Sequence, residues 1–375
     1  MVYKEFQGKK LSALGFGAMR LPVMSGDNSQ IDIEKTKEMV AYAMKNGVNY
    51  YDTAWGYHGG QSELVMGEIL SEYPRESYYL ASKFPGYDLS NMDKVQEIFE
   101  KQLEKCQTEY FDFYLFHNVC ELNIDSYLDK KFGIFDYLIE QKRNGRIKHL
   151  GFSVHGTIET MERFLNAYGK DMEFCQIQLN WVDYHFQSAD KKLDMLKKWN
   201  IPVWVMEPVR GGKLARLTEK QNDILKGYRD VPAVEWAFRF LQTIPEVTVT
   251  LSGMSDFEQI KQNIDIYSTE KPLTDEEMNT LFGFAKEMTD EKILPCTSCK
   301  YCITHCPQEI NIPYLIELYN EHIFTGGGFI ASMALGAIEP EKQPSACVGC
   351  QSCEQVCPQN IKIAEMMSDF VRIVK

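Results

Sequence analysis

Three features that would assign this chain to particular classes of protein are missing from its sequence. No run of about eighteen apolar residues occurs, so we expect no membrane span. The first six residues lack the basic and apolar segments of a secretory signal, and we therefore expect a cytoplasmic protein. Basic residues are in the minority: 40 Lys and Arg against 53 Asp and Glu leave a net charge of −13. That charge argues against a nucleic-acid-binding surface.

The remaining composition is that of an ordinary soluble protein. Hydrophobic residues make up 44% of the chain and charged residues 25%. A length of 375 residues is more than one small domain needs, so we expect two domains.

Cysteine is distributed unevenly, and eight of the 11 cysteines lie in two runs near the C-terminus. The first run reads Cys296-x-x-Cys299-x-x-Cys302-x-x-x-Cys306-Pro, and the second reads Cys347-x-x-Cys350-x-x-Cys353-x-x-x-Cys357-Pro. This spacing is typical of bacterial two-cluster ferredoxins, in which the fourth cysteine of each run binds the cluster of the other run. We therefore predict one 4Fe–4S cluster on Cys296, Cys299, Cys302 and Cys357, and a second on Cys347, Cys350, Cys353 and Cys306.

Two other uses of these cysteines are less consistent with the spacing. Zinc sites with four cysteines also use C-x₂-C pairs, but they need neither a third cysteine at the same interval nor a distant fourth before proline. Disulfides need an oxidising compartment, and nothing in the sequence marks one.

Upstream of the cysteines, short apolar segments alternate with amphipathic ones. Two strand-like runs at residues 2–6 and 10–14 are joined by Gln7-Gly8-Lys9, which predicts a hairpin. The strand candidates that follow are Phe16–Leu21, Asn49–Thr53, Tyr78–Ser82, Phe111–Phe116, His149–Ser153, Phe174–Leu179, Val203–Met206 and Val247–Leu251. The helix candidates are Ile33–Asn46, Glu63–Ser71, Met92–Gln107, Ser126–Arg143, Thr157–Tyr168, Ser188–Trp199, Pro232–Leu241 and Asp256–Ile266.

Eight alternations of strand and helix predict an α/β fold with a parallel sheet, and eight strands close a (β/α)₈ TIM barrel. An open doubly wound sheet is the alternative. Its Gly-x-Gly-x-x-Gly signature is incomplete, because Arg20 stands where the third glycine would be. We predict a barrel over residues 1–270, a linking helix over 271–294 and a mainly helical ferredoxin-like domain over 295–375. Thr274 and Glu277 form a capping box that predicts the start of the linking helix.

Four polar side chains follow three neighbouring strands of the predicted barrel: Asp52 and Tyr57, then Lys83, then His117. The C-terminal ends of barrel strands meet on one rim, where function lies. A cation beside a phenol lowers the pKa of that phenol, so we expect Lys83 to lower the pKa of Tyr57. Asp52 would hold Lys83, and His117 would orient a substrate oxygen. Such a set can protonate a carbonyl oxygen while a hydride reaches the carbon.

These residues carry a resemblance to the aldo-keto reductase family over about residues 1–270. The whole chain resembles the bacterial subgroup of that family that has a C-terminal ferredoxin-like domain. The resemblance implies a (β/α)₈ barrel with an N-terminal hairpin, a nicotinamide dinucleotide across the rim, and Tyr57 as general acid. The matching segments are Leu14-Gly15-Phe16-Gly17, Asp52-Thr53-Ala54 with Tyr57, Lys83, His117, Gly151-Phe152-Ser153, Gln176, Glu207-Pro208-Val209-Arg210-Gly211-Gly212 and Ser252-Gly253-Met254-Ser255 through Asn263.

The resemblance also implies cofactor contacts. Ser153 and Gln176 would bind the nicotinamide carboxamide, the loop Glu207–Gly212 would wrap the pyrophosphate, and Asn263 would lie near the adenine. The full set is Gly17, Met19, Ser153, Gln176, Met206, Glu207, Val209, Gly211, Gly253, Ser255, Gln259 and Asn263.

Several positions differ from the family's pattern. Met206 replaces an aromatic residue, and Val154 replaces an amide. The uncharged Gly253 and Gln259 stand where basic residues usually bind a 2′-phosphate. The sequence therefore does not decide between NAD and NADP, and it contains no flavin motif.

Two hypotheses of different classes follow. In the first, the protein is an oxidoreductase that acts on a small carbonyl or alcohol, and its clusters either exchange electrons with a redox partner protein or only stabilise the fold. In the second, it is an electron-transfer or binding module whose barrel has lost carbonyl chemistry.

Overall fold

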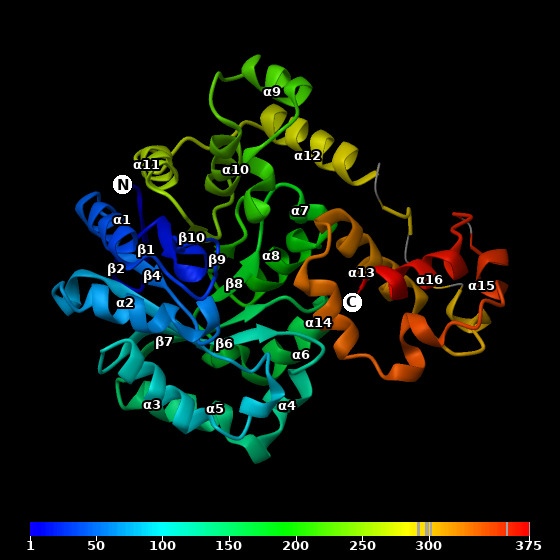
Figure 1. Cartoon of the computed structure of the whole chain (residues 1–375), viewed down its shortest axis with the longest axis horizontal. Coiled ribbons are helices and arrows are strands. Elements are labelled where there is room, and N and C mark those ends of the chain that lie inside the picture. Colours follow the sequence, from blue (N-terminus) through cyan, green and yellow to red (C-terminus); the bar gives the residue numbers. More distant parts are fainter. Residues whose placement is uncertain (291–292, 297–299, 301, 358, 375) are drawn as a thin grey trace. The chain divides into compact units, whose positions relative to one another are not determined.

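The computed structural model describes residues 1–290, 293–296, 300, 302–357 and 359–374 (Figure 1). The chain divides into two compact units. The first comprises Met1–Val119 and Asn123–Leu281, and the second comprises Cys120–Leu122 and Phe282–Lys375. The domain boundaries predicted from the sequence stay predictions.

The strands and helices have the following bounds. The strands are β1 (Tyr3–Phe6), β2 (Lys9–Ser12), β3 (Leu14–Gly17), β4 (Tyr50–Asp52), β5 (Tyr79–Phe84), β6 (Phe111–Val119), β7 (Ile147–Val154), β8 (Cys175–Gln178), β9 (Val203–Met206) and β10 (Val247–Gly253). The α-helices are α1 (Ile33–Lys45), α2 (Ser62–Leu70), α3 (Val95–Lys105), α4 (Ile124–Leu128), α5 (Ile134–Arg143), α6 (Ile158–Tyr168), α7 (Asp183–Phe186), α8 (Ala189–Lys198), α9 (Glu219–Lys226), α10 (Ala233–Gln242), α11 (Phe257–Ile266), α12 (Asp275–Asp290), α13 (Ile312–Thr325), α14 (Phe329–Gly336), α15 (Ser352–Gln355) and α16 (Ile363–Ile373). Short 3₁₀ turns near the rim are η1 (Ala18–Arg20), η2 (Tyr57–Gly60) and η7 (Arg210–Ala215).

The first unit is the predicted parallel barrel. Strands β3 to β10 close on themselves in the order β10-β3-β4-β5-β6-β7-β8-β9, and helices surround the strands in Figure 1. All pairings in the barrel are parallel. The structure therefore confirms the (β/α)₈ barrel and excludes the open sheet.

The antiparallel hairpin β1–β2 closes the barrel at the start of its strands. The Phe6 ring lies 5.2 Å from the ring of Trp204 and 5.7 Å from that of Phe113. Both partners stand near the beginnings of their strands. Because this end is filled, the opposite rim, at the C-terminal ends of the strands, is left for function. The buried cluster inside the barrel comprises Phe6, Leu11, Tyr50, Ala81, Phe113, Leu115, Phe174, Trp204, Val249 and Leu251.

Two predicted elements differ from the structure. The first barrel strand ends at Gly17 rather than Leu21, because the chain turns into η1 there and the Ser62 hydroxyl donates to the Ala18 carbonyl. The single helix predicted over residues 126–143 is broken at Gly133, whose φ of 62° is incompatible with a continuous helix. The apolar periodicity on both sides of this break made it look like one helix.

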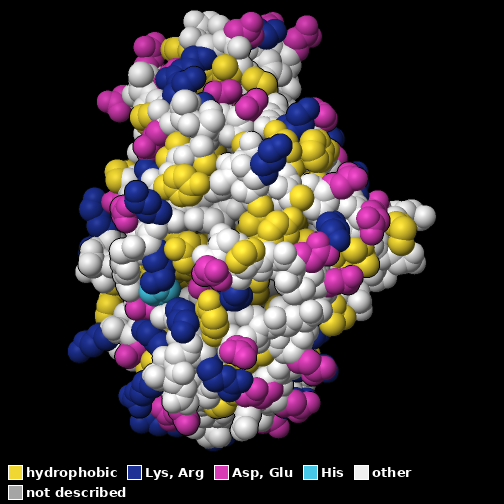
Figure 2. Space-filling view, turned by 90° about the vertical axis from the view of Figure 1, so that its left-hand side faces the viewer, with side chains coloured by type: hydrophobic (Ala, Val, Ile, Leu, Met, Phe, Trp, Pro, Cys, Tyr) yellow, Lys and Arg dark blue, Asp and Glu magenta, His cyan; other side chains and the backbone are white. Residues whose placement is uncertain are grey.

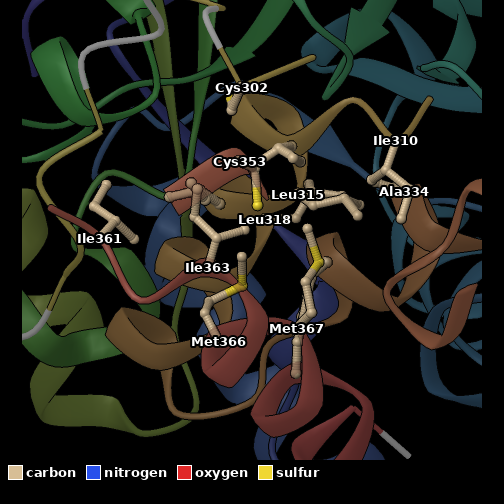
Figure 3. Packing of buried hydrophobic residues seen from close by; sticks show 14 residues of the cluster. Cys302, Ile310, Leu315, Leu318, Ala334, Cys353, Ile361, Ile363, Met366 and Met367 are labelled. Carbon is tan, nitrogen blue, oxygen red and sulfur yellow. The ribbon is translucent and has the colours of Figure 1, made fainter. Parts of the chain in front are cut away.

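The second unit is helical. Its described residues form helices, short turns and loops, as the sequence predicts. The capping box at the start of α12 is present: the Thr274 N–H donates to the Glu277 carboxylate, and the Glu277 N–H donates to the Thr274 hydroxyl. The buried core of the second unit contains Cys302, Ile310, Ile312, Leu315, Ile316, Leu318, Ala331, Ala334, Cys353, Ile361, Ile363, Met366, Met367 and Phe370 (Figure 3).

Charge is mixed on the surface. On the face shown in Figure 2, Lys and Arg side chains lie among Asp and Glu side chains. Within the described residues, none of the helices has both the length and the apolar character needed to cross a bilayer.

Candidate active site and cluster ligands

The catalytic candidates meet on the rim because neighbouring strands are in register there. Gly17 pairs with Asp52, and Asp52 pairs with Ala81, two residues before Lys83. The Lys83 ammonium lies 2.6 Å from Asp52 Oδ1 and donates a second hydrogen bond to the Thr53 carbonyl at 2.7 Å. Lys83 is fully buried, so its charge is compensated by a partner that the fold places beside it.

Tyr57 and His117 lie beside this pair. The Lys83 Nζ is 4.9 Å from the centre of the Tyr57 ring. The Tyr57 and His117 rings meet edge-on, with their centres 6.2 Å apart. On another side of His117 the Tyr87 ring lies 5.2 Å away. The structure thus brings together all four residues that the sequence analysis selected.

Burial decides how these groups titrate. Burial raises the pKa of Tyr57 above 10, and this effect exceeds the lowering by Lys83. The expected net lowering of the Tyr57 pKa is therefore wrong, because the protein around this half-buried ring disfavours the charged phenolate more than Lys83 favours it. Burial opposes the charge of Lys83, but Asp52 and Tyr57 together raise its pKa above 10.5. Burial, then Lys83 and His155, hold the pKa of His117 well below 6.5, so this imidazole is neutral.

A buried network supports the loop that carries Tyr57. The Glu63 Oε1 accepts hydrogen bonds from the Ser82 hydroxyl at 2.7 Å and the Gln102 amide at 2.6 Å. Its Oε2 accepts from the Lys105 ammonium at 3.0 Å. Lys105 in turn lies 4.3 Å from the ring centre of Trp55, two residues before Tyr57. The carboxylate of Glu63 therefore links β5, α3 and the Tyr57 loop from outside the barrel.

His58 fastens the next segment. Its Nε2 accepts the Leu21 N–H at 3.0 Å, which places the proton on Nδ1, 2.7 Å from the Asn28 carbonyl. This arrangement needs the neutral ring. Burial lowers the pKa of His58 in agreement with that. His58 thus ties the loop after β3 to the loop that carries Tyr57.

Acidification should therefore destabilise the barrel. The pKa values of His58 and His117 are lowered by burial, and that of His155 is lowered to about 3. A lowered pKa in the folded state means that the unfolded chain binds more protons, so stability is complete above about pH 6.5 and falls below it. At pH 5.5 we expect a loss of about 1 kcal/mol for each histidine that stays neutral.

Tryptophan fluorescence during urea unfolding at pH 7.5 and 5.5 measures this loss in the barrel alone, because all 5 tryptophans lie between residues 55 and 236. The variant His185→Gln, at an exposed histidine, should keep the full pH dependence. An unfolding midpoint that is equal at the two pH values would contradict the expectation.

The residues predicted to hold the nicotinamide carboxamide are neighbours. Ser153 of β7 and Gln176 of β8 pair in register, and both are buried. The Ser153 hydroxyl accepts the Asn118 N–H at 2.7 Å, which leaves its own proton available. Within the described residues, the buried Gln176 Oε1 has no hydrogen-bond partner. A buried acceptor of this kind is costly unless a ligand satisfies it, so these residues fit an amide-bearing ligand.

The loop after β9 is held by a buried ion pair that sequence reasoning missed. The Arg210 side chain turns inward and lies 2.9 Å from the Asp183 carboxylate. Asn180 bonds both this carboxylate and the Glu207 carbonyl. These contacts explain why Glu207 and Arg210 adopt positive φ angles of 55° and 47°. Nothing in the spacing of the sequence indicated that α7 would supply the partner.

The other predicted cofactor contacts lie along the same rim. Gly17 and Gly253 pair at the ends of β3 and β10. Met19 is exposed, and Met206 is partly buried at the end of β9. Val209 precedes η7, and Gly211 has a φ of 64° within it.

Beyond β10, the side chains form hydrogen bonds within the barrel. The Ser255 hydroxyl donates to the Arg20 carbonyl, and the Ser255 N–H donates to Gln259. Asn263 is buried and donates to Ser252. The proposed contact of Asn263 with adenine stays a prediction.

In the second unit, one pocket is lined by all four cysteines predicted for the second cluster: Cys306, Cys347, Cys350 and Cys353. Ile310, Ile363 and Met367 form part of its apolar wall. Burial, with the Cys306 and Cys347 thiols nearby, raises the pKa of Cys353 to about 11. Cys306 belongs to the first run in sequence, so its place beside the second run is a tertiary feature. The pocket thus gathers the four cysteines that the sequence predicts for the second cluster.

The described residues contain no group of three or more His, Cys, Asp or Glu side chains close enough to hold a single metal ion. This is compatible with the pocket, because ligands of a cube stand around a cavity rather than converge on a point. For the first predicted cluster, Cys302 is buried in the core of the unit and Cys296 and Cys357 pack against it. Cys299 lies outside the described residues. The ten described cysteines are all free of disulfides.

Comparisons with known proteins agree with both units. The profile of the "Aldo/keto reductase family" matches residues 13–285. The profile of the "4Fe-4S dicluster domain" matches residues 295–362.

Individual relatives cover different shares of the chain. "Probable aldo-keto reductase 1" from Glycine max is 28% identical over an alignment of 155 residues that covers 39% of this chain and 42% of that protein. The uncharacterized oxidoreductase YqkF from Bacillus subtilis is 23% identical over 74% of this chain and 94% of its own length. The crystal structure of an aldo-keto reductase from Klebsiella pneumoniae in complex with NADPH has a TM-score of 0.58 and 18% identity, covering 76% of this chain and 96% of that one.

Proposed function

Since this chain is an oxidoreductase that belongs to the aldo/keto reductase family and carries a 4Fe–4S dicluster domain, we propose that it reduces a small carbonyl compound, or oxidises the corresponding alcohol, with Tyr57 as the proton donor and acceptor. The observation that carries this proposal is the buried Lys83 ammonium, held 2.6 Å from Asp52 and 4.9 Å from the Tyr57 ring. The test is the variant Tyr57→Phe, which removes the reacting hydroxyl and keeps the ring.

Each of the four residues has a separate task. Tyr57, whose pKa is raised by burial, stays protonated at neutral pH and can give its proton to the carbonyl oxygen. The Lys83 ammonium then stabilises the phenolate that remains, and Asp52 holds the ammonium in place. His117 is neutral, and in the described residues its buried Nδ1 has no partner. The imidazole can therefore orient the substrate oxygen by a hydrogen bond without adding charge.

A nicotinamide dinucleotide, when bound, would supply or accept the hydride. Ser153 and Gln176 would hold its carboxamide, since their free donor and unsatisfied acceptor match the two ends of an amide. The Glu207–Gly212 loop would surround the pyrophosphate. The likeness to a structure that contains NADPH supports a dinucleotide of this class. Whether NADH or NADPH is preferred is not decided by the residues around Gly253 and Gln259.

For the second unit we propose two 4Fe–4S clusters, one on Cys347, Cys350, Cys353 and Cys306 and one on Cys296, Cys299, Cys302 and Cys357. Such clusters carry one electron at a time, whereas a hydride carries two. Exchange between cluster and rim therefore needs a carrier able to divide the electron pair. A redox partner protein would serve as the external donor or acceptor.

Anaerobic titration of the purified protein with NADH and with NADPH tests this exchange. If the units are coupled and the carrier is present, the visible absorption of the clusters should bleach on addition of one of the two nucleotides, whereas dithionite should bleach it in every case. Bleaching by dithionite but by neither nucleotide would contradict electron exchange between the nucleotide and the clusters.

A structural role for the clusters is the second candidate. It is favoured by the burial of Cys302 and Cys353 within the core of the second unit, where Cys353 lies among Leu315, Leu318 and Ile363 (Figure 3). Metal binding there would supply folding free energy. The alternative to an enzyme is an electron-transfer or binding module whose barrel has lost carbonyl chemistry. If the protein is such a module, Tyr57→Phe would have no effect on its function.

A further inference from the structure

Arg20 lies between the two loops that approach each other on one side of the rim. Its Cβ is 3.0 Å, and its Cγ and Cδ 3.2 Å, from the point where a Cβ on Gly253 would stand. Its Nη2 is 3.4 Å from the corresponding point on Gly211. The Ser255 hydroxyl holds the Arg20 carbonyl at 2.9 Å. The side chain thus passes along Gly253 at the end of β10 and ends over Gly211 in the loop after β9.

Both glycines matter for this path. A side chain at residue 253 would contact the stem of Arg20 closely and would require that stem to shift. Gly211 has a φ of 64°, where an L-residue is strained, and it lies within van der Waals reach of the guanidinium. The positive charge on this side of the rim is therefore that of Arg20, which follows β3. Position 253, a glycine, carries no charge.

The guanidinium has spare donors. It forms an ion pair with the Glu207 carboxylate at 3.7 Å, which is longer than a hydrogen bond. Half of the Arg20 side chain is exposed, and such exposed pairs contribute little to stability. In the described residues no hydrogen bond runs from the guanidinium to another group. A phosphate can accept two parallel bonds from it and is the better partner.

We propose that Arg20 binds the pyrophosphate of the nicotinamide dinucleotide. Its weak ion pair with Glu207 breaks when the phosphate oxygens bind. This inference rests on the proposed function, since it concerns the same rim. Glu207 is then a competitor: its carboxylate both occupies the arginine and repels the phosphates. The two residues should have opposite effects on affinity.

The experiment measures the dissociation constants of NADH and NADPH by calorimetric titration of the full-length protein. Arg20→Gln should weaken the binding of both nucleotides in the same proportion, by about tenfold or more, because a hydrogen bond to a charged group is lost. Arg20→Lys should recover part of the affinity. Glu207→Gln should tighten binding by about two- to fivefold, which is the range of an exposed ion pair.

The matched control is Arg163→Gln. Arg163 lies on α6, is as exposed as Arg20 and also pairs with a carboxylate, that of Asp125, so its loss should leave both constants unchanged. Unchanged affinity in Arg20→Gln, or weaker binding in Glu207→Gln, would overturn the inference. A loss of affinity for NADPH alone would indicate that Arg20 binds the 2′-phosphate, and it would overturn the pyrophosphate assignment. If the unsubstituted protein binds neither nucleotide, the proposed function itself fails.

Discussion

Replacing Tyr57 by phenylalanine is expected to lower the rate of carbonyl turnover by about 10²–10⁴-fold, the usual contribution of a positioned proton donor. The ring, its edge-on contact with His117 and the ring face near Lys83 are kept, so the change removes only the hydroxyl. The measurement is steady-state turnover of a panel of small aldehydes and ketones with NADH or NADPH. The decrease should appear in kcat, because the lost interaction develops in the transition state.

Two readouts separate the loss of the proton donor from general damage. The visible absorbance of the clusters and the affinity for nucleotide should be the same in Tyr57→Phe as in the unsubstituted protein. The variant Tyr87→Phe removes a hydroxyl from the other ring that contacts His117, and its effect on kcat should be far smaller. Turnover of Tyr57→Phe within a factor of ten of the unsubstituted protein would disprove the assignment of Tyr57.

The second large effect concerns the cysteine that crosses between the two runs. Cys306→Ala should remove one of two clusters, so that iron falls from about eight to about four atoms per chain. The reason is the pocket that Cys306 shares with Cys347, Cys350 and Cys353. Iron and sulfide are counted after anaerobic purification.

A double variant makes this test sharp. If Cys306 and Cys350 bind the same cluster, Cys306→Ala with Cys350→Ala should retain about four iron atoms, like each single variant. If each run instead bound its own cluster, the double variant would retain none while the single variants retained half. Cys106→Ala changes a buried cysteine of the barrel and should keep the full iron content.

Much of this protein could be predicted from local patterns. The alternation of apolar strands and amphipathic helices predicted the barrel. The spacing of apolar residues along each element reflects whether one face or both faces of it are buried. The catalytic candidates were predicted because a residue that follows a barrel strand must lie on the rim. The cysteine runs predicted iron–sulfur clusters because three ligands at fixed short intervals come from one segment of chain.

The sequence by itself thus determined the barrel, the composition of the rim and the type of metal centre, all of which depend on short intervals along the chain. Tertiary structure alone decided the net rise in the Tyr57 pKa, because burial depends on what surrounds the hydroxyl. It also decided that Arg210 turns inward to Asp183 while Arg20 lies over the glycine loops. These contacts join residues tens to hundreds of positions apart, and no local interval carries information about them.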